Sequence, residues 1–166
     1  MITQPQLLKM SLSPSDVVYT PEWVARDMVD FFRPSGRVLD SCKGQGAFTQ
    51  FLPNAEWCEI DKGRDFFQWK ERVDWIIGNP PYSMFSKWLA HSMEVADNIC
   101  YLIPLVRLFA SGYSIKRLDR WGKIMHMRYY ADGGELNWNI GFAIGAVYFQ
   151  RNYTGPMYTT IAELIP

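Results

Sequence analysis

The sequence predicts an α/β fold built on a mostly parallel, doubly wound sheet. Short apolar runs occur at residues 37–40, 73–78 and 98–103, and each is typical of a buried strand. Segments with helical spacing of apolar residues precede the first of these runs and separate the last two. Strands that alternate with helices in this way form parallel sheets covered by helices on both faces.

The composition describes a globular, aromatic-rich chain without an overall electrostatic signature. Of the 166 residues, 48% are hydrophobic and 16% aromatic, and 17 basic residues balance 17 acidic ones. A chain of this length is large enough for the core of one domain. Because the charges balance, any binding of nucleic acid has to rely on a local basic patch.

The three cysteines, Cys42, Cys58 and Cys100, are odd in number and far apart. This pattern predicts reduced thiols in a cytoplasm, and it lacks the spacing of a zinc site. The two histidines are isolated from the cysteines, so no metal site is expected. The apolar runs are shorter than the roughly 20 residues that span a bilayer, and the first 15 residues lack a signal-peptide pattern. We therefore expect a soluble, cytoplasmic protein without a membrane partner.

The first ordered element is predicted to be a helix. Residues 1–16 have little periodicity and are expected to form a loose arm. Thr20 followed by Pro21 predicts a helix start, with threonine as the N-cap and proline at the first helical position. Apolar side chains at three- and four-residue spacings continue the helix to about Phe32.

A glycine-rich loop follows the first strand. Gly44 and Gly46 lie between this strand and a predicted helix, and they let the backbone pass close to a ligand. A dinucleotide fingerprint requires a third glycine where Thr49 stands, which disfavours a nicotinamide cofactor. The P-loop motif is also absent from the sequence.

Two acidic residues beyond the loop point to an adenosine-containing cofactor. The second predicted strand, residues 56–61, carries Glu59, which lies 19 positions after Asp40. This is close to the separation at which an acid reaches ribose hydroxyls in Rossmann-like sites. Asp65 and Phe66 then form a pair that can hydrogen-bond and pack an adenine ring. The alternative for this pair is a polar turn with a core phenylalanine.

The tetrapeptide Asn79-Pro80-Pro81-Tyr82 ends the strand at residues 73–78. The prolines stop the strand at its carboxyl end, where ligands bind in open α/β sheets. An amide side chain, a carbonyl and an aromatic ring are thereby held in a rigid cluster that suits a flat group with an amino function. A simple turn is the alternative interpretation. A helix capped by Ser83 is expected to follow, up to about Ala96.

The third quarter of the chain is basic. Six cations stand there against the single acid Asp119, with three aromatic residues between them. The pattern predicts either a phosphate-contacting patch with stacking rings or a solvated helix face. The cations are Arg107, Lys116, Arg117, Arg120, Lys123 and Arg128.

Two further strands are expected at residues 123–130 and 142–150. The turn-rich segment between them contains Trp138, which is either a core aromatic or a second wall of the substrate pocket. The chain is predicted to be a single catalytic domain, with the arm at residues 1–16, a core at residues 17–150 and a tail at residues 151–166.

Several of these motifs, in this order, resemble the S-adenosylmethionine-dependent adenine-N6 DNA methyltransferases. Thr20-Pro21 resembles the family's N-terminal cofactor motif, residues 38–48 its Asp-x-x-x-Gly-x-Gly-x-Phe motif, and residues 79–82 its catalytic motif. Small phage and prophage members are particularly similar, including at residues 141–147. The resemblance covers roughly residues 17–150.

The resemblance implies a fold, a cofactor and a set of site residues. The fold is a Rossmann-like class I methyltransferase sheet with an antiparallel strand near the C-terminus, in the cytoplasm of a bacterium or of a phage-infected host cell. Asn79, Pro80, Pro81 and Tyr82 are the implied catalytic residues. S-adenosyl-L-methionine is implied to bind at Tyr19, Thr20, Pro21, Asp40, Ser41, Gly44, Gly46, Phe48, Glu59, Ile60, Asp65, Phe66 and Asn79. Substrate is expected to contact Tyr82, Trp138, Lys116, Arg117 and Arg120.

The implied reaction is direct methyl transfer to the amino group of a flipped or single-stranded adenine. Asn79 and the Pro80 carbonyl would accept the amino hydrogens, and Tyr82 would stack on the base. Cys42 is interpreted as a small loop residue and not as a catalytic thiol.

Two departures from the family leave the substrate open. The connection between Glu59 and Asp65 is too short for the family's usual helix, which leaves room for a trimmed sheet, and a separate target-recognition domain is missing. The partners expected are therefore DNA, single- or double-stranded, with a homodimer or a separate specificity partner left open. RNA adenine, protein glutamine and a non-catalytic cofactor-binding relative remain alternatives.

Overall fold

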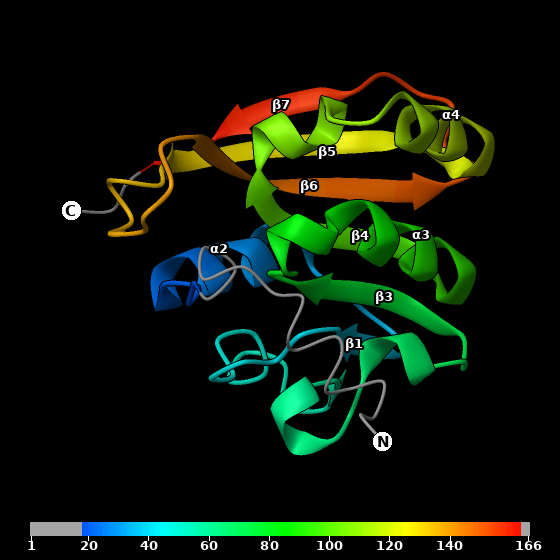
Figure 1. Ribbon diagram of the computed structural model, residues 1–166, viewed down its shortest axis with the longest axis horizontal. Helices are drawn as coiled ribbons and strands as arrows, with labels where there is room; N and C mark the ends of the chain where they lie inside the picture. The colour runs from blue at the N-terminus through cyan, green and yellow to red at the C-terminus, as the bar shows by residue number, and fades with distance from the viewer. Residues whose placement is uncertain (1–17, 164–166) are drawn as a thin grey trace, which may run out of the picture.

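The computed structural model describes residues 18–163, so the predicted arm at residues 1–16 lies outside the described residues. Seven strands form one sheet in the order β2-β1-β3-β4-β6-β5-β7 (Figure 1). β2, β1, β3 and β4 are parallel neighbours, β6 is antiparallel to both β4 and β5, and β7 is parallel to β5. The strands are β1 Val38–Asp40, β2 Glu56–Trp57, β3 Val73–Gly78, β4 Ala96–Pro104, β5 Gly122–Asp132, β6 Ala143–Arg151 and β7 Tyr158–Ile161.

The core of the molecule lies on the central strands β3 and β4. Ile76 and Ile77 of β3 are fully buried, and so is every residue from Ile99 to Ile103 of β4. Such unbroken apolar runs occur in strands that are covered on both faces, because neither face can then be polar. The three buried strands predicted from the sequence are β1, β3 and β4 of the structure.

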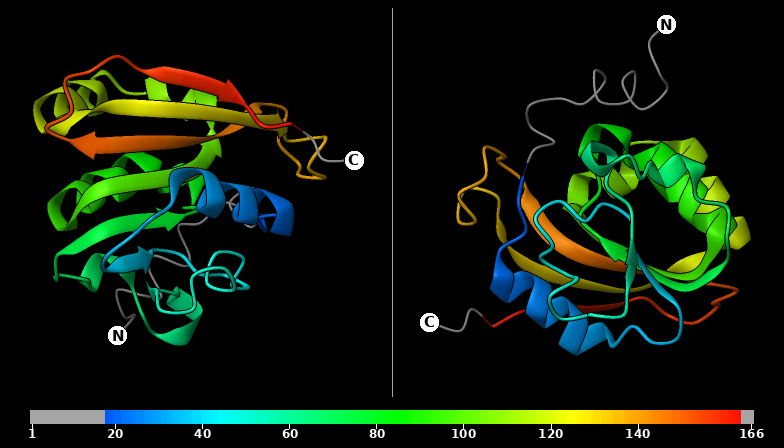
Figure 2. Two further views of the ribbon diagram at one scale, coloured as in Figure 1. Left: turned by 180° about the vertical axis from the view of Figure 1, so that it is seen from behind. Right: turned by 90° about the horizontal axis from the view of Figure 1, so that it is seen from below.

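Helices cover both faces of the sheet, as the doubly wound prediction requires (Figure 2). α2, Glu22–Phe32, lies on one face and buries Val24, Ala25, Met28 and Phe32. α3, Phe85–Val95, and α4, Gly112–Trp121, lie together on the other face. α3 presents a largely buried side to the sheet, whereas α4 has no buried residue and packs on α3 and β5. The predicted fold class, mostly parallel with an antiparallel strand near the C-terminus, is confirmed.

Both helix starts differ from the prediction. Pro21 occupies the N-cap position of α2, and no side chain caps this helix. The Thr20 hydroxyl is not a cap because it accepts a hydrogen bond from Asn79 instead. The predicted Ser83 cap is also wrong: Ser83 lies inside the 3-10 turn η4, Tyr82–Met84, and α3 begins one residue after that turn.

The connections on either side of β2 are short and contain no α-helix in the described chain. Successive turns occupy residues 41–51, where the sequence predicts that a helix follows the glycine loop. β2 is only two residues long because the chain folds back at Glu59, which bridges to Arg64. Two 3-10 turns, η2 Ile60–Lys62 and η3 Phe66–Gln68, then lead to β3. The expectation of a trimmed sheet between β2 and β3 is confirmed.

The segment interpreted as a tail contains the last strand. β7 pairs with β5 along residues His126 to Tyr129 and forms one edge of the sheet. Its exposed residues Tyr158 and Ile161 explain why the sequence pattern did not predict a buried strand there. A short 3-10 turn, η5 Leu105–Phe109, connects β4 to the loop before α4. Within residues 18–163, no helix is both long enough and apolar enough to span a bilayer.

Candidate active site

The loops that follow β1 and β3 lie side by side at the carboxyl edge of the sheet. Asp40 pairs with Ile77 in register, so the chain leaves both strands at the same level. Gly78 makes the close approach possible: a Cβ there would lie 3.1 Å from Cys42 Sγ and 3.3 Å from Ser41 Oγ. The glycine loop and the Asn-Pro-Pro-Tyr motif thereby become neighbours.

The glycine loop has the backbone that its two glycines permit. Gly44 and Gly46 have φ angles of +52° and +90°, which side chains other than glycine rarely adopt. The Gly44 amide donates to Glu59 Oε2 at 2.7 Å, and this bond ties the loop to the end of β2. A Cβ on Gly44 would meet no atom within 4 Å, so the space beside this residue is open.

Two adjoining cavities lie along this edge, with volumes of about 270 Å³ and about 370 Å³. They share six lining residues, among them Gly44 and Asn79, so together they form one elongated hollow. Its size falls within the roughly 300–1,000 Å³ of small-molecule sites. The shared residues are Val18, Tyr19, Cys42, Gly44, Gln45 and Asn79.

Most of the cofactor residues predicted from the sequence line this hollow. The smaller cavity is bounded by Thr20, Gly46 and Phe48 beside the shared residues. The larger cavity is bounded by Ser41, Glu59, Ile60, Asp65 and Phe66. Asp40 and Pro21 lie outside the lining, Asp40 fully buried beneath the loop and Pro21 at the start of α2.

Asn79 lies where the two cavities meet. Among the described residues, its side-chain nitrogen has hydrogen-bond partners and its side-chain oxygen has none. Nδ2 donates to Thr20 Oγ1 at 3.1 Å and makes a longer contact of 3.5 Å with the Val18 carbonyl oxygen. The backbone amide of Asn79 faces the Cys42 thiol and lowers its pKa, although burial raises that pKa more strongly. Oδ1 is buried and accepts no hydrogen bond from residues 18–163. An unpaired buried acceptor costs folding free energy, so its presence at a cavity indicates a ligand that donates to it.

Asp40 is the second residue with an unpaired acceptor. Oδ1 accepts from the Cys42 amide at 3.2 Å, whereas the buried Oδ2 accepts nothing from residues 18–163. Burial above all, and also the negative charge of Glu59, raise the pKa of the Asp40 carboxyl to about 7, against the lowering effects of the Cys42 amide and Lys43. Asp40 therefore titrates near neutral pH beneath the glycine loop.

A buried hydrogen-bond network fixes Ser41 from below. The indole of Trp88 donates to Ser41 Oγ at 3.0 Å, and this hydroxyl lies 3.2 Å from that of Tyr101. The Tyr101 hydroxyl in turn lies 2.7 Å from Ser92 Oγ. α3 and β4 thus hold the glycine loop, although nothing in the local sequence around these residues predicts the link.

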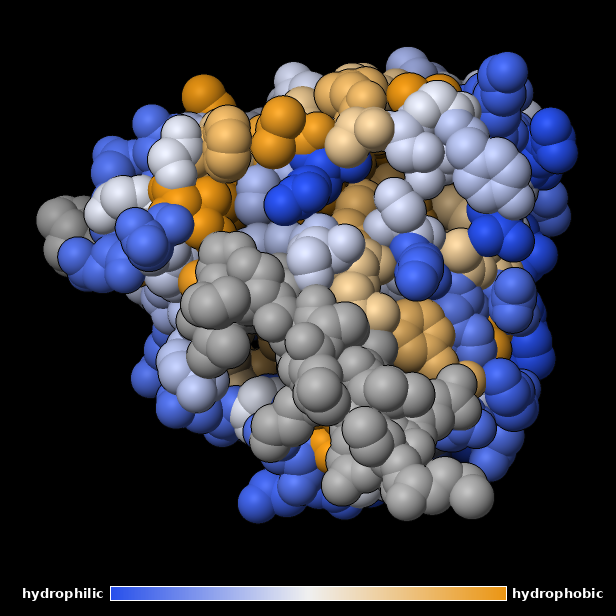
Figure 3. Space-filling model, in the orientation of Figure 1, coloured by the Kyte–Doolittle hydropathy of each residue, from blue (hydrophilic) through white to orange (hydrophobic). Residues whose placement is uncertain are grey.

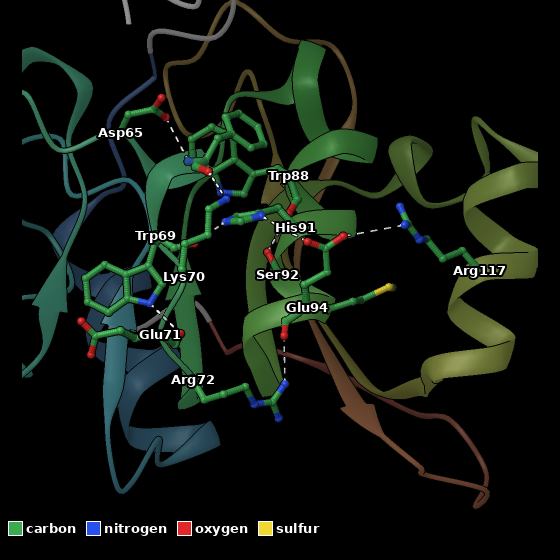
Figure 4. Close-up of polar contacts among 12 residues, drawn as sticks. Asp65, Trp69, Lys70, Glu71, Arg72, Trp88, His91, Ser92, Glu94 and Arg117 are labelled. Carbon is green, nitrogen blue, oxygen red and sulfur yellow. Dashed lines mark hydrogen bonds and ion pairs between the residues drawn. The ribbon is translucent and has the colours of Figure 1, made fainter. Parts of the chain in front are cut away.

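Asp65 and Phe66 form a polar turn with a core phenylalanine, the alternative interpretation of their motif. Asp65 accepts from the Phe67 amide at 3.0 Å and so begins η3, as a polar turn would (Figure 4). Phe66 is 2% exposed and stacks on Trp88 at 4.9 Å between ring centroids. Both residues nevertheless line the larger cavity. The Trp88–Phe66 stack is therefore core packing whose edge reaches the site.

Trp138 comes from the distant turn between β5 and β6 and packs beside the Asn-Pro-Pro-Tyr motif. Its indole nitrogen donates to the Tyr19 carbonyl oxygen at 3.1 Å. Its ring centroid lies 6.5 Å from that of Tyr82, and both side chains are less than 10% exposed. Neither ring lines the two cavities, so Trp138 and Tyr82 form an aromatic pair beside the hollow.

Two basic residues near the larger cavity were not predicted. The Lys43 ammonium and the Arg64 guanidinium lie 4.2 Å and 4.1 Å from the ring centroid of Trp57. Lys43 lines the smaller cavity and Arg64 the larger one. Their positions next to the glycine loop and to Asp65 were the only available signal in the sequence.

The predicted substrate contacts on α4 are not brought to Asn79. Lys116, Arg117 and Arg120 line a separate depression between α3 and α4. Arg117 reaches across to Glu94 of α3, with 3.9 Å between nitrogen and oxygen (Figure 4). Among residues 18–163, no three His, Cys, Asp or Glu side chains lie close enough together to hold a metal ion.

Solved structures with a similar arrangement include methyltransferases and their subunits. A protein from Listeria monocytogenes, described as a class I S-adenosylmethionine-dependent methyltransferase, is 10% identical, with 96% of this chain and 70% of that chain covered and a TM-score of 0.63. The M protein of the type I restriction enzyme EcoKI is 13% identical, with 90% and 48% covered and a TM-score of 0.62. A modification subunit described for a type I restriction enzyme of Vibrio vulnificus YJ016 is 15% identical, with 96% and 50% covered and a TM-score of 0.59.

The fold is that of class I methyltransferases. Identities this low establish the fold alone. The sequence itself matches no model of a protein family and no curated protein. The chain spans about half the length of the type I restriction-modification structures that it resembles.

Proposed function

We propose that this protein transfers the methyl group of S-adenosyl-L-methionine to the N6 amino group of adenine in DNA. The observation that carries the proposal is Asn79 Oδ1, a buried acceptor without a partner at the junction of two cavities. An amino group has hydrogens to donate, and it is the kind of ligand that such an acceptor lacks. The Nδ2 atom is already held by Thr20, so the side chain cannot turn to use its own donor instead.

The lining of the hollow fits the proposed cofactor. Glu59 carries carboxylate oxygens that can accept from ribose hydroxyls, since it lies just after β2, caps η2 and borders the larger cavity. Asp65 and the Phe66 edge suit the adenine at the far end of that cavity. The open space beside Gly44 and the smaller cavity, with Tyr19 and Thr20, suit the amino-acid part. When bound, S-adenosyl-L-methionine supplies a methyl group on a positively charged sulfur.

The chain's own residues would act by positioning the amino nitrogen. Asn79 Oδ1 and the Pro80 carbonyl oxygen would accept its two hydrogens, which biases the nitrogen toward a tetrahedral, nucleophilic geometry. Placing the nitrogen about 3–3.5 Å from the methyl carbon then accounts for much of the rate. The N–C bond forms as the C–S bond breaks, and the nitrogen afterwards releases one proton to water. Tyr82 and Trp138 would have to turn toward the hollow to stack on the adenine, because neither ring lines it.

The Thr20 hydroxyl is the positioning group in this proposal. It accepts from Asn79 Nδ2 and so fixes the direction of Oδ1. Burial raises the pKa of the Cys42 thiol well above its ordinary value, which supports a structural and not a nucleophilic role.

DNA is favoured as the acceptor by two similar structures. One is described as a complex of a type I restriction-modification system, and another as a complex of DrdV with DNA, 11% identical with a TM-score of 0.62. These names belong to those proteins, and they support DNA here only through the shared fold. A homodimer or a separate specificity partner remains part of the proposal, because those proteins are longer than this chain.

The test is a transfer assay with S-adenosylmethionine labelled in its methyl group. Purified protein would be offered single-stranded DNA, duplex DNA and RNA, and the digested products would be analysed by mass spectrometry. We expect labelled N6-methyladenine from DNA. Label confined to RNA would overturn the substrate but keep the reaction class. Bound cofactor with no transfer to any acceptor would overturn the proposal and favour a non-catalytic protein.

A further inference from the structure

The groove between α3 and α4 carries an unusual combination of free cations and exposed aromatic rings. Two adjoining depressions, of about 200 Å³ and about 470 Å³, follow the line between the helices. Tyr113 and Arg117 border both depressions, so they form one continuous groove. Ser86 and Ser111 lie at one end of this α3–α4 groove, and Trp121 and Arg151 at the other.

The groove is positively charged because, among the described residues, five cations and one acid, Glu94, border it. In the described part of the chain, no acidic group forms an ion pair with Lys87, Lys116 or Arg120. Asp119, the acid of α4, is neutralised by Lys123 at 2.6 Å. Glu94 lies 3.9 Å from Arg117 and 3.7 Å from His91, and Arg151 pairs with Asp97 at 2.7 Å. Strongly hydrophilic side chains gather at the upper right of Figure 3, where Figure 1 places α4.

Two aromatic rings project from the same region into solvent. Phe109, at the end of η5, is 71% exposed, and Tyr113, in the first turn of α4, is 73% exposed. The Arg117 guanidinium lies 5.9 Å from the Tyr113 ring centroid. Large aromatic side chains this exposed have no role in the packing of the core. Their π-faces suit stacking against flat rings of a partner.

The near end of the groove adjoins the catalytic motif. Ser86 and Lys87 belong to the first turn of α3. This helix begins directly after η4, the short turn that contains Tyr82. η5 follows Pro104 at the carboxyl end of β4, the same edge of the sheet at which Asn79 lies. A polymer whose target base occupies the Asn79 site can therefore continue into the groove.

We propose that the α3–α4 groove binds the single-stranded nucleic acid next to the target base, with Lys87, Lys116 and Arg120 on phosphates and Tyr113 stacked on a base. Only unpaired bases expose the faces that Phe109 and Tyr113 can stack on, because in a duplex these faces are buried between neighbouring pairs. The unpaired cations favour a polyanion over an apolar protein segment. The inference rests on the proposed function for its substrate class, and it adds that the preferred form is single-stranded.

The experiment measures fluorescence anisotropy of a labelled single-stranded oligodeoxynucleotide and of its duplex. We expect the wild-type protein to bind the single strand more tightly. Tyr113→Ala should weaken that binding about 5- to 150-fold, the effect of losing one base–aromatic stack, and Tyr113→Phe should retain it. Tyr158→Ala, an equally simple loss of an exposed tyrosine on β7, is the matched control and should change nothing.

The cations are tested through the dependence of binding on salt. Replacing Lys116 and Arg120 together by glutamine should reduce the slope of log affinity against log salt by about 1.4, since each phosphate contact on a single strand contributes about 0.7. Arg33→Gln, an exposed cation at the end of α2, should leave the slope unchanged. Equal or tighter binding of the duplex, or unchanged affinity in Tyr113→Ala, would overturn the inference.

Failure of the groove and failure of the proposed reaction give different results. In an Asn79→Ala background, Tyr113→Ala should still weaken binding of the single strand, because Asn79 does not line the groove. Groove-dependent binding without methyl transfer by the wild type would contradict the reaction and retain the groove. Methylation of duplex DNA, with no effect of Tyr113→Ala on binding or turnover, would retain the reaction and contradict the groove.

Discussion

Two polar clusters of this protein differ in whether their hydrogen-bond acceptors are paired. Between α2 and β5, Asp27 accepts from Arg128 at 2.7 Å and 2.8 Å and from the Tyr130 hydroxyl at 2.6 Å. At the carboxyl edge of β1 and β3, by contrast, Asn79 Oδ1 and Asp40 Oδ2 are buried and accept nothing. The first cluster is complete in the protein alone. The second contains two buried acceptors to which no described residue donates.

The difference extends to the acidity of the two aspartates. Burial raises the pKa of Asp27, but the hydrogen bonds from Arg128 and Tyr130 outweigh it and leave this pKa below its usual value. Burial also raises the pKa of Asp40, and there the Cys42 amide and Lys43 are too weak to offset it. Polar groups that serve only the fold are paired, and unpaired ones mark the place where a ligand completes the structure.

The largest effect is expected on stability at the complete cluster. Asp27→Ala leaves the Arg128 guanidinium, whose side chain is 13% exposed, without its partner. The free energy of unfolding should fall by about 3–5 kcal/mol, as measured by urea denaturation. Asp30→Ala, an exposed aspartate on the same helix, should change it by less than about 0.5 kcal/mol. Equal losses of unfolding free energy in the two variants would show that the Asp27 cluster stabilises the fold no more than an exposed aspartate does.

The second-largest effect is expected on the rate of methyl transfer, at the cluster of Asn79 and Asp40. Asn79→Ala removes the unpaired acceptor, so turnover should fall by roughly 10²–10³-fold, as for the loss of one preorganised group at a reacting centre. S-adenosylmethionine should still bind, and the free energy of unfolding should fall by about 0.5–1.5 kcal/mol, because the substitution also removes the Nδ2 hydrogen bond to Thr20. Asn54→Ala, an exposed asparagine, is the control for turnover. Wild-type turnover in Asn79→Ala would refute the assigned role.

A smaller effect is expected where an acceptor is shared between protein and ligand. Glu59→Ala removes the carboxylate that holds the Gly44 amide and that we assign to the ribose. Calorimetry should show affinity for S-adenosylmethionine weakened by about 1.5–3 kcal/mol, the value of hydrogen bonds to a charged group. Glu59→Gln keeps one acceptor oxygen and should lose less. Unchanged affinity in the alanine variant would rule out this assignment.

The smallest effect is a dependence of stability on pH. Because the folded protein raises the pKa of Asp40 from 3.8 to about 7, the contribution of Asp40 to stability is full at acidic pH and declines as the pH rises through that value. Between about pH 6 and pH 8, this contribution should fall by about 1.4 kcal/mol. The difference in unfolding free energy between the wild type and Asp40→Asn should decrease accordingly. A constant difference would place the pKa of Asp40 outside this range.

The sequence predicted those parts of the fold and site that depend on local pattern. The apolar runs predicted β1, β3 and β4, and the spacing of Gly44, Gly46 and Glu59 predicted residues that line one hollow. Each of these signals lies within a short stretch of chain, where residue type and backbone conformation are directly linked.

The remaining features depend on partners far along the chain. Thr20 looked like a helix cap, but Asn79, 59 positions away, takes its hydroxyl. Trp88 holds Ser41 from 47 positions away, and Trp138 holds Tyr19 from 119. β7 is exposed on its outer side and has no buried pattern of its own, so only its pairing with β5 defines it. Local patterns contain no information on such pairings.

The most direct test compares methyl transfer per folded molecule in two variants, Asn79→Ala and Asp27→Ala. Single-turnover reactions with labelled S-adenosylmethionine and single-stranded DNA would be run at a temperature at which both proteins are folded. The account predicts that Asn79→Ala binds cofactor and transfers almost no label, while Asp27→Ala transfers label at the wild-type rate despite its lower stability. Normal transfer by Asn79→Ala, or loss of transfer in folded Asp27→Ala, would contradict it.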